Sequence, residues 1–341
     1  MKQTIKTSCL LCKEKENVVY CTAQDNQNNV NTFTIVKCSR CHFLYLNPVP
    51  AKKKLSTYYP SYYWVGEKQK FIEKIFPFFF SASQEKTRYV KKYKAYGSLL
   101  DIGCAEGFFL KYMKKQGWNV IGIDFSEKAV AFGKEHLGLE LYAGEITGIE
   151  NKLKKNFDVI TLWATLEHVY DPLETLRAAH RLLKEDGVLI FAVPNIESIQ
   201  AKVFRRYWLH LDVPRHLCFF TPKTVKMLCD KADFVIKDVS YQSVEHNPGG
   251  WVYSFLYYIR EKKNKKNKHK EESKEVSEAE ESDAFSKIIR EKPYKKERMS
   301  AARIFFYWLV DNIIIPLIVP LTYVEGFLKK GGTITVIAKK K

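Results

Sequence analysis

Two pairs of cysteines near the start of the chain have the spacing of a metal site. Cys9 and Cys12 form one C-x-x-C pair, and Cys38 and Cys41 form the other. Four thiolates suit tetrahedral zinc, and the long gap between the pairs could be filled by a hairpin. We therefore expect one structural zinc ion, because a closed four-cysteine site leaves no open position for catalysis. Ordinary reduced thiols are the alternative.

A tight turn after an acidic strand end points to a ligand site. In "LLDIGCAEGFFL", Asp101 ends an apolar strand, and Gly103 and Gly107 allow the backbone to approach a ligand closely. The next expected strand ends in Asp124, where an acidic side chain commonly binds paired ribose hydroxyls. No G-x-G-x-x-G is present and an acid lies beside the turn, so the motif predicts a nucleoside site rather than a pyrophosphate site.

Two histidines lie at positions in the sequence that suit proton transfer. His168, beside Glu167, follows the fourth expected strand, and His216 lies in a loop after the fifth. A neutral imidazole can accept a proton from a hydroxyl. A loop-bracing hydrogen bond is the favoured interpretation of His168, whereas catalysis and structure are equally supported for His216. Glu167 and His168 could instead bind a divalent ion, and Arg215 could pair with an anionic group of a substrate.

Alternating apolar strands and helices must position these residues. We expect strands at 98–103, 119–126, 139–146, 157–169, 188–195 and 234–241, and helices at 107–117, 127–138, 171–187 and 221–233. Short apolar strands separated by helices predict an α/β fold with a doubly wound, mostly parallel sheet covered on both faces. Ligands of such sheets bind beyond the carboxyl ends of the strands, where the acids and histidines named above fall.

At these residues the chain resembles the class I S-adenosylmethionine-dependent methyltransferases. The resemblance is carried by "LLDIGCAEGFFL", "VIGIDFS", "AGEI", "FDVITLWATLEHVYDP", "LLKEDGVLIFAVPN" and the terminal "GGTITVIAKK". It implies a Rossmann-like methyltransferase fold and S-adenosylmethionine as the cofactor. The residues that it places at the cofactor are Asp101, Gly103, Cys104, Ala105, Gly107, Asp124, Phe125, Glu145 and Ile146.

The resemblance also implies what each part of that set binds. Asp101 and the backbone of 103–107 would lie against the methionine portion, Asp124 would take the ribose hydroxyls, and Glu145 with Ile146 would lie near the adenine. Ala105 stands where the family usually has a third glycine, and alanine is small enough to keep the turn.

Two further segments narrow the resemblance to methyltransferases that carry a zinc ribbon. These segments are "CHFLYLNPVP" and "LDVPRHLCFFTPKTVKMLCDKADFVI". Such proteins are often associated with bacterial surface-glycan and small-metabolite pathways. The expected organisation is a zinc-ribbon-like module at 1–50, an aromatic-rich helical connector at 51–96, the methyltransferase core at 97–245, an insertion with a charged linker and apolar helices at 246–330, and the final core strand at 331–341.

The charge and the insertion suggest partners. A net charge of +18 favours an acidic partner such as RNA, an anionic membrane or a phosphate-bearing substrate. A basic block at 260–270 and an acidic one at 271–283 are expected to be solvated and mobile. The apolar stretch 302–328 is followed by a core strand, so we expect it to lie on a membrane surface or pack against the domain or a second subunit.

These features lead to one leading function and two alternatives. The leading function is S-adenosylmethionine-dependent methyl transfer to a sugar, a glycolipid intermediate or another small metabolite, with the acceptor atom (O, N or C) left open. The alternatives are an RNA methyltransferase and a non-catalytic assembly protein that binds zinc and the cofactor. Cysteine usage and the absence of a signal peptide at the start of the sequence predict a cytoplasmic protein. If the apolar stretch 302–328 lies on a membrane, the protein would be peripheral on its inner face.

Overall fold

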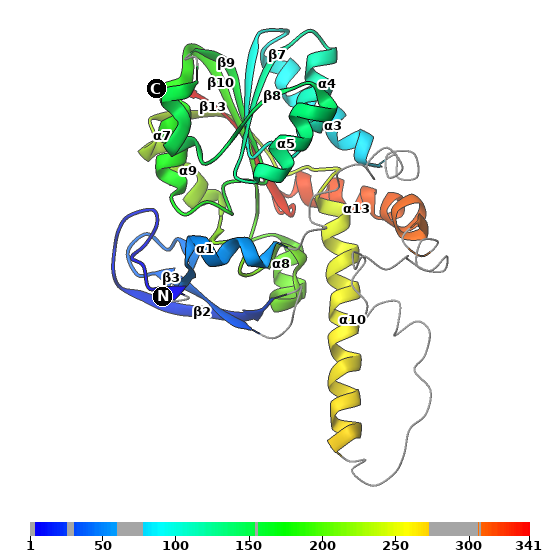
Figure 1. Cartoon of the computed structure of the whole chain (residues 1–341). Helices are drawn as coiled ribbons and strands as arrows, with labels where there is room; N and C mark the ends of the chain where they lie inside the picture. The colour runs from blue at the N-terminus through cyan, green and yellow to red at the C-terminus, as the bar shows by residue number, and fades with distance from the viewer. Residues whose placement is uncertain (1–3, 26–30, 60–77, 154–155, 273–305, 307) are drawn as a thin grey trace.

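A seven-stranded sheet forms the centre of the molecule (Figure 1). The computed structural model describes residues 4–25, 31–59, 78–153, 156–272, 306 and 308–341. The sheet order is β12-β13-β10-β9-β6-β7-β8, in which β13 runs antiparallel between β10 and β12 and the remaining pairs are parallel. This confirms the expected doubly wound sheet. The strands are β6 (Ser98–Ile102), β7 (Asn119–Asp124), β8 (Glu140–Ala143), β9 (Phe157–Trp163), β10 (Leu183–Pro194), β12 (Phe234–Ser240) and β13 (Thr333–Lys340).

Helices cover both faces of this sheet because its strands are apolar on both sides. Leu99 and Val159 pack into one apolar cluster, while their neighbours Leu100 and Ile160 pack into another on the opposite face. The first face carries α3 (Phe78–Tyr93), α4 (Phe108–Lys115) and α5 (Glu127–Leu137); the second carries α6 (Ile146–Ile149), the short helix η3 (Glu150–Lys152), α7 (Pro172–Leu182) and α9 (Pro222–Lys231).

Several of the expected boundaries were wrong, including the end of the strand expected at 139–146, which is at Ala143. The strand expected at 157–169 ends at Trp163, because Ala164 turns the backbone with a φ of 50°. The helix expected to run to residue 187 ends at Leu182, since Leu183 already pairs with Phe157 in the sheet. The earlier end of β9 releases the segment with Glu167 and His168 from regular structure at the carboxyl edge of the sheet.

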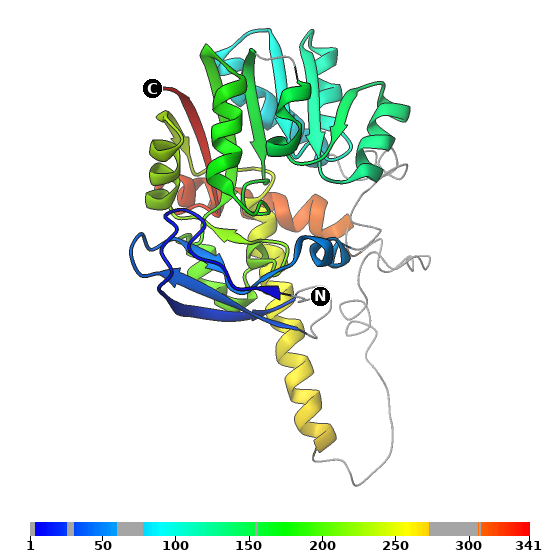
Figure 2. The ribbon, with the colours of Figure 1, turned by 60° about the vertical axis from the view of Figure 1, so that its left-hand side comes forward.

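The N-terminal module is a small sheet that borrows a strand from the core segment. Its order is β11-β4-β3-β2, and β11 comes from the loop after the fifth core strand. Figure 2 shows these strands beside the central sheet. The module expected at 1–50 therefore includes a strand from a later part of the chain, because β11 pairs with β4. The elements are β1 (Thr4–Ile5), β2 (Asn17–Gln24), β3 (Thr32–Cys38), β4 (Leu44–Leu46), β5 (Val49–Pro50) and β11 (Cys218–Phe219).

The connector and the C-terminal insertion supply helices. The basic block at 260–270 was expected in a mobile segment but forms the second half of α10, which projects from the body (Figures 1 and 2). Most of the acidic block, and residues 302–305 and 307 of the apolar stretch, lie outside the described residues, as do 60–77 of the connector. The helices are α1 (Lys52–Leu55), η1 (Ser56–Tyr58), α8 (Ile199–Phe204), η4 (Arg205–Tyr207), η5 (Leu209–Leu211), α10 (Asn247–Glu272), the π-helix η6 (Val310–Ile314) and α13 (Ile315–Phe327).

Within the ranges that the structure describes, no helix combines the length and the apolar composition needed to cross a bilayer.

Candidate functional site

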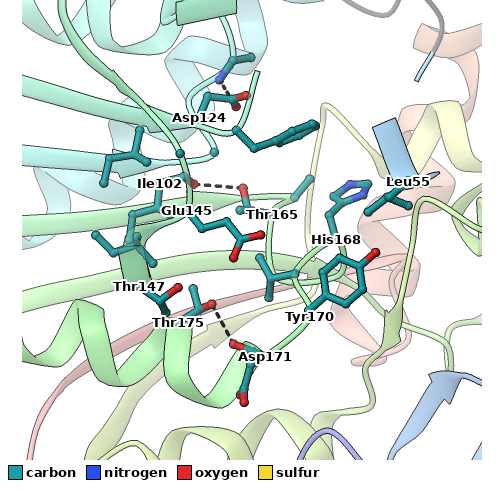
Figure 3. A pocket seen from close by; sticks show the side chains of 18 of the residues that line it. Leu55, Ile102, Asp124, Glu145, Thr147, Thr165, His168, Tyr170, Asp171 and Thr175 are labelled. Atoms are coloured by element: carbon teal, nitrogen blue, oxygen red, sulfur yellow. Dashed lines mark hydrogen bonds between the residues drawn. The ribbon is translucent and has the colours of Figure 1, made fainter. Parts of the chain in front are cut away.

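A cavity of about 480 Å³ opens at the carboxyl ends of β6, β7 and β9. It lies where the strand order reverses, because β6 has β7 on one side and β9 on the other. Figure 3 shows Asp124 toward one end of the cavity and His168 with Tyr170 toward the other. The residues from the predicted sites that line it are Gly103, Ala105, Asp124, Phe125, Glu145, Ile146 and His168.

The turn after β6 has the backbone shape that its sequence predicts. Gly103 has a φ of +80°, and a Cβ there would overlap the side chain of Thr165. The Thr165 hydroxyl donates to the Ile102 carbonyl at 3.1 Å, so this neighbour is fixed in place. Gly107 has a φ of +86°, and Ala105 between them adopts a φ of 49°. Alanine therefore keeps the turn but in a left-handed conformation that glycine adopts at lower cost.

Asp124 is held so that both of its carboxylate oxygens face backbone donors. The Ala105 N–H donates to Oδ2 at 2.9 Å, and the Ser126 N–H donates to Oδ1 at 2.8 Å. Burial raises the pKa of Asp124 to about 6, and these two hydrogen bonds oppose that rise. Each oxygen has a further lone pair, so the carboxylate fits the ribose hydroxyls of S-adenosylmethionine.

Three predicted cofactor residues lie behind the turn rather than on the cavity wall. Asp101 is buried and accepts a hydrogen bond from the Thr161 hydroxyl at 2.7 Å, and burial raises its pKa to about 7. Cys104 is buried among the apolar side chains on the α4 face. Gly107 meets Leu139, whose Cδ1 would lie 2.6 Å from an added Cβ. These residues shape the turn, and their direct contact with the cofactor stays a prediction.

The connector closes the cofactor end of the cavity from outside the core. Lys52 in α1 forms an ion pair with Glu145, with 2.7 Å between Nζ and Oε2. The ring of Phe125 packs against Tyr59, with centroids 5.2 Å apart. Side chains from the connector thus reach over the predicted nucleoside position.

Glu167, His168 and His216 form a cluster at the other end. One ligand atom from each lies within 4.8 Å of the other two. The two imidazole rings meet edge to face, with centroids 4.5 Å apart. Glu167 is buried, and neither of its carboxylate oxygens has a hydrogen-bond partner among the described residues. His168 lines the cavity, whereas His216 and Glu167 lie behind it.

The hydrogen-bond network assigns the tautomers of both histidines. His168 Nδ1 lies 3.0 Å from the Arg215 carbonyl oxygen, and His216 Nδ1 lies 2.8 Å from that of His210. A carbonyl oxygen only accepts, so Nδ1 carries the proton in each ring and Nε2 keeps a lone pair. Burial lowers the pKa of both histidines and raises that of Glu167 to about 8. The cluster can therefore receive a proton or a divalent cation.

Arg215 has a different role from the one expected. Its guanidinium is buried and donates to Asp212 at 2.6 Å and to Asp25 at 3.0 Å. It also donates to the Tyr58 carbonyl oxygen at 3.1 Å. Burial alone would raise the pKa of Asp212, but the guanidinium outweighs it and lowers that pKa to about 2. The proposed pairing with a substrate anion was wrong, because Arg215 joins the N-terminal module to the histidine loop.

Tyr59 is the residue at this end that the sequence interpretation missed. Its hydroxyl lies 3.1 Å from His168 Nδ1. The sequence predicted only an aromatic-rich helical connector in this segment and no site residue. The available signal was that its rings between 58 and 63 are all tyrosines, whose hydroxyls a purely apolar contact would not need.

The four N-terminal cysteines converge as their spacing predicts. Their sulfur atoms lie within 4.8 Å of one another, with 3.5 Å for Cys9–Cys41 and for Cys12–Cys38. Zn–S bonds of about 2.3 Å would place the sulfurs of a tetrahedral site about 3.8 Å apart. Burial raises the pKa of the Cys9 thiol to about 11, a change that a bound cation would reverse. The donor set fits structural zinc.

Both cysteine pairs share one backbone device. The residue after the second cysteine is left-handed in each: φ is 62° at Lys13 and 63° at His42. The N–H groups of these two residues donate to the carbonyl oxygens of Cys9 and Cys38, at 2.9 and 3.1 Å. The two turns thus present their thiols in the same manner, as two halves of one metal site would.

Known proteins similar to this chain are methyltransferases. A family profile described as "Methyltransferase domain" matches residues 70–239. The ubiquinone biosynthesis O-methyltransferase of Azoarcus sp. (strain BH72) is 31% identical over 170 residues, which cover 46% of this chain and 71% of that protein. The protein of the same name from Pseudomonas aeruginosa (strain UCBPP-PA14) is 36% identical over 102 residues, which cover 28% of this chain and 44% of that protein. The chain thus spans less than half the length of some of these relatives.

One solved structure aligns with most of this chain. A SAM-dependent methyltransferase from Archaeoglobus fulgidus aligns with 82% of this chain and 100% of its own, at 19% identity and a TM-score of 0.45. With its sheet order, its turn after β6 and its identity to the Azoarcus protein, this chain belongs to the class I S-adenosylmethionine-dependent methyltransferases.

Proposed function

We propose that this protein transfers a methyl group from S-adenosylmethionine to a hydroxyl of a small molecule. The observation that carries the proposal is that a single cavity is lined both by the predicted cofactor residues and by His168. An acceptor at the histidine end would lie beside the cofactor end, as in-line transfer requires. We include a structural zinc ion at Cys9, Cys12, Cys38 and Cys41, which the convergence of their sulfurs supports.

Oxygen is the acceptor atom that two observations favour. The relatives named above are O-methyltransferases, and the buried Glu167–His168–His216 cluster, which reaches the cavity wall at His168, could accept the proton that a hydroxyl acceptor loses. Their name places those relatives in ubiquinone biosynthesis and gives no support to a sugar. The substrate test should therefore include two classes of acceptor. One is sugar hydroxyls, which the sequence resemblance suggested, and the other is aromatic hydroxyls.

The residues of the cavity divide the work of the reaction. S-adenosylmethionine supplies an electrophilic methyl group carried on a sulfonium. Asp124 would hold the ribose hydroxyls, and the turn that lines the cavity at Gly103 and Ala105 would lie against the methionine portion. The hydroxyl of the acceptor becomes a methyl ether and loses its proton to Nε2 of His168, the ring at the cavity wall. Tyr59 and the Arg215 carbonyl orient that ring through Nδ1, which is the bracing role that the sequence also suggested.

A divalent ion is the second use of the same cluster. Glu167 supplies a carboxylate, and the two histidines supply Nε2 atoms whose Nδ1 protons are bound by carbonyl oxygens, as metal-ligating histidines commonly are. Metal analysis separates the two uses. Zinc at the cysteines alone gives one metal per chain, and an ion at the cluster gives a second that His216→Ala would remove.

The cavity wall is a poor match for a nucleic-acid substrate. The described lining includes four acidic residues and a single lysine, Lys52, which is paired with Glu145. Phosphate backbones are bound by clustered Lys and Arg, and such a wall would repel them. A small acceptor is the better fit than RNA. A non-catalytic role is disfavoured because it would give no use to the Glu167–His168–His216 cluster.

Substitution of the two histidines tests the proposal. The substrate panel contains phenolic and sugar hydroxyls, and S-adenosylhomocysteine formation is the readout. His168→Ala is expected to lower turnover by about a hundredfold or more, and His216→Ala to lower it less, with cofactor affinity measured by calorimetry unchanged. The control is His136→Ala, which replaces an exposed histidine on α5 that does not line the cavity. Full turnover in both cavity variants would contradict a proton-accepting cluster, and the absence of cofactor binding would contradict the function as a whole.

A further inference from the structure

Helix α13 is amphipathic in the opposite sense from an ordinary surface helix. Its polar side chains Thr322 and Glu325 are buried, whereas Leu317 is 74% exposed and Phe327 is 87% exposed. A helix at the surface of a globular protein normally turns its apolar stripe inward. The outward direction of this stripe therefore needs an explanation.

The inward polar face is held by specific partners, so the helix cannot simply rotate. Gln200 Nε2 donates to Glu325 Oε2 at 3.3 Å and to the Asn247 carbonyl oxygen at 2.8 Å. On the previous turn, Gln242 Nε2 donates to the Thr322 hydroxyl at 3.4 Å. Rotation would expose the apolar inner residue Ile315, break these bonds and leave buried amides without partners.

The helix is also fixed at its end by the core sheet. Lys330 and Gly331 follow the helix, and both of their carbonyl oxygens accept hydrogen bonds from the core. The Ile199 N–H donates to the Lys330 oxygen at 3.1 Å, and Asn195 Nδ2 donates to the Gly331 oxygen at 3.0 Å. The strand β13 then enters the sheet between β10 and β12. Figure 1 shows α13 beside the end of α10 that is nearest the sheet.

The outward residues form one continuous apolar surface, which we call the α13 outer face. Several of them recur at intervals of three and four residues, which places them on one side of the helix. Between Asn312 and Leu328 the only acidic residue is the buried Glu325. The members of the face are Ile313, Pro316, Leu317, Pro320, Leu321, Tyr323, Val324, Phe327 and Leu328.

The size of this face argues against a second protein copy as its partner. From Ile313 to Leu328 a helix rises by about 22 Å, so a stripe roughly 10 Å wide offers on the order of 200 Å². Stable protein interfaces bury about 800 Å² on each partner. Binding to a bilayer does not require a minimum buried area, because each apolar side chain that enters the acyl boundary contributes independently to the free energy of binding.

The charges at the end of the face match an anionic surface. Lys329 and Lys330 follow Leu328 at the end of the helix, whose last two turns carry the aromatic residues Tyr323 and Phe327. Aromatic rings beside lysines are typical of helices at the membrane–water interface. We propose that the α13 outer face docks on the surface of an anionic bilayer, with the helix lying in the interface plane. This proposal does not depend on the methyl acceptor.

Vesicle flotation of the full chain tests the proposal. The probes are vesicles of phosphatidylcholine alone and of phosphatidylcholine with phosphatidylglycerol in equal amounts. We expect binding to the anionic vesicles, and a reduction of about fivefold for each lysine in Lys329→Gln and Lys330→Gln. The triple variant Leu317→Ser, Val324→Ser, Phe327→Ser is expected to reduce binding by about a hundredfold or more.

A matched control comes from another exposed apolar surface. Val18 and Val19 on β2 are each more than half exposed, and Val18→Ser with Val19→Ser should leave vesicle binding unchanged. Cofactor affinity, measured alongside, shows that each variant is folded. The proposal is overturned if the wild type does not float, if the control variant loses binding equally, or if the protein is a dimer in solution that ignores vesicles and that the triple variant converts to monomers.

Discussion

The two ends of the cavity are built in different ways. At the cofactor end, Asp124 binds the Ala105 N–H, and both come from consecutive strand–turn units of one sheet. At the histidine end, His168 touches Tyr59, which lies 109 residues earlier, and the Arg215 carbonyl, 47 residues later. The turn and Asp124 at the cofactor end are thus determined by the core sheet, and the connector only covers them through Lys52 and Tyr59. The histidine end exists only after the connector, the core and the N-terminal module have assembled.

The N-terminal module is the main support of the histidine end. Its Asp25 binds Arg215, and the Leu46 N–H donates to the Leu217 carbonyl oxygen at 2.9 Å, on either side of His216. By contrast, the turn from Gly103 to Gly107 is packed by residues of the core. The difference between the two ends should therefore appear whenever the module is weakened.

Loss of zinc should give the largest such effect. Structural zinc contributes on the order of 10 kcal/mol to small zinc modules, so Cys38→Ser should unfold this one locally. We expect loss of one zinc per chain and a fall in turnover of about a hundredfold, with cofactor affinity nearly unchanged. Cys21→Ser, in the same module but outside the cluster, is the control. Equal loss of turnover and cofactor affinity would show that the two ends are not separable.

Removal of the buried guanidinium should be the next largest effect. Arg215→Met leaves Asp25 and Asp212 without their cation and should lower the free energy of unfolding by about 3–5 kcal/mol. Arg181→Met, which breaks exposed pairs to Glu150 and Glu174, should cost at most about 1 kcal/mol. Urea unfolding measures both. A similar loss in the two variants would argue against a special role for Arg215.

The ion pair between Arg215 and Asp212 should make the stability of the fold depend on pH. The pKa of Asp212 falls from its usual 3.8 to about 2 in the folded protein. A depressed carboxyl pKa stabilises the fold above the unfolded value, and this contribution is lost as the pH falls from about 4 toward 2. The difference in unfolding free energy between the wild type and Arg215→Met should therefore narrow across that range.

The contrast between the two ends also explains what the sequence could predict. Strand ends, a glycine turn and a following acid are local signals, so the mostly parallel sheet, the turn and the position of Asp124 followed from short motifs. Cysteine pairs carry their own geometry in the same way. The Arg215–Asp25 pair and the Tyr59–His168 contact join distant segments, and no spacing encodes them. The helical state of the basic block was missed because charge runs carry no periodic apolar signal.

At the cofactor end, Asp124→Ala should act on binding alone. The ribose hydroxyls would lose their acceptor, which should weaken S-adenosylmethionine binding by about 1–3 kcal/mol. Asp124→Asn keeps the shape of the side chain and should lose less. Calorimetry provides the affinity, and metal analysis should still find the zinc. Unchanged affinity would refute the assignment of Asp124 to the ribose.

Tyr59→Phe should have a smaller effect, and only at the histidine end. It removes a hydroxyl that contacts His168 Nδ1 at 3.1 Å, worth about 0.5–1.5 kcal/mol, or a few-fold in turnover. Because that oxygen stabilises the protonated ring, the variant should also shift the acidic limb of the rate profile toward lower pH. Tyr142→Phe on β8, whose hydroxyl binds Glu140, is the control and should leave both turnover and profile unchanged.

Ala105→Gly should have the smallest effect and the opposite sign. Relief of the left-handed φ of 49° should raise the free energy of unfolding by about 1 kcal/mol or more. The greater freedom of glycine in the unfolded chain should lower it by about 0.5–1 kcal/mol. The net change is a slight gain in thermal stability with unchanged cofactor affinity. Gly103→Ala is the counterpart, because its φ of +80° and the side chain of Thr165 leave no room for a Cβ. If Ala105→Gly instead destabilised the protein or weakened the cofactor, the Ala105 methyl would itself be a binding contact, and the cofactor end would depend on side chains as much as the histidine end does.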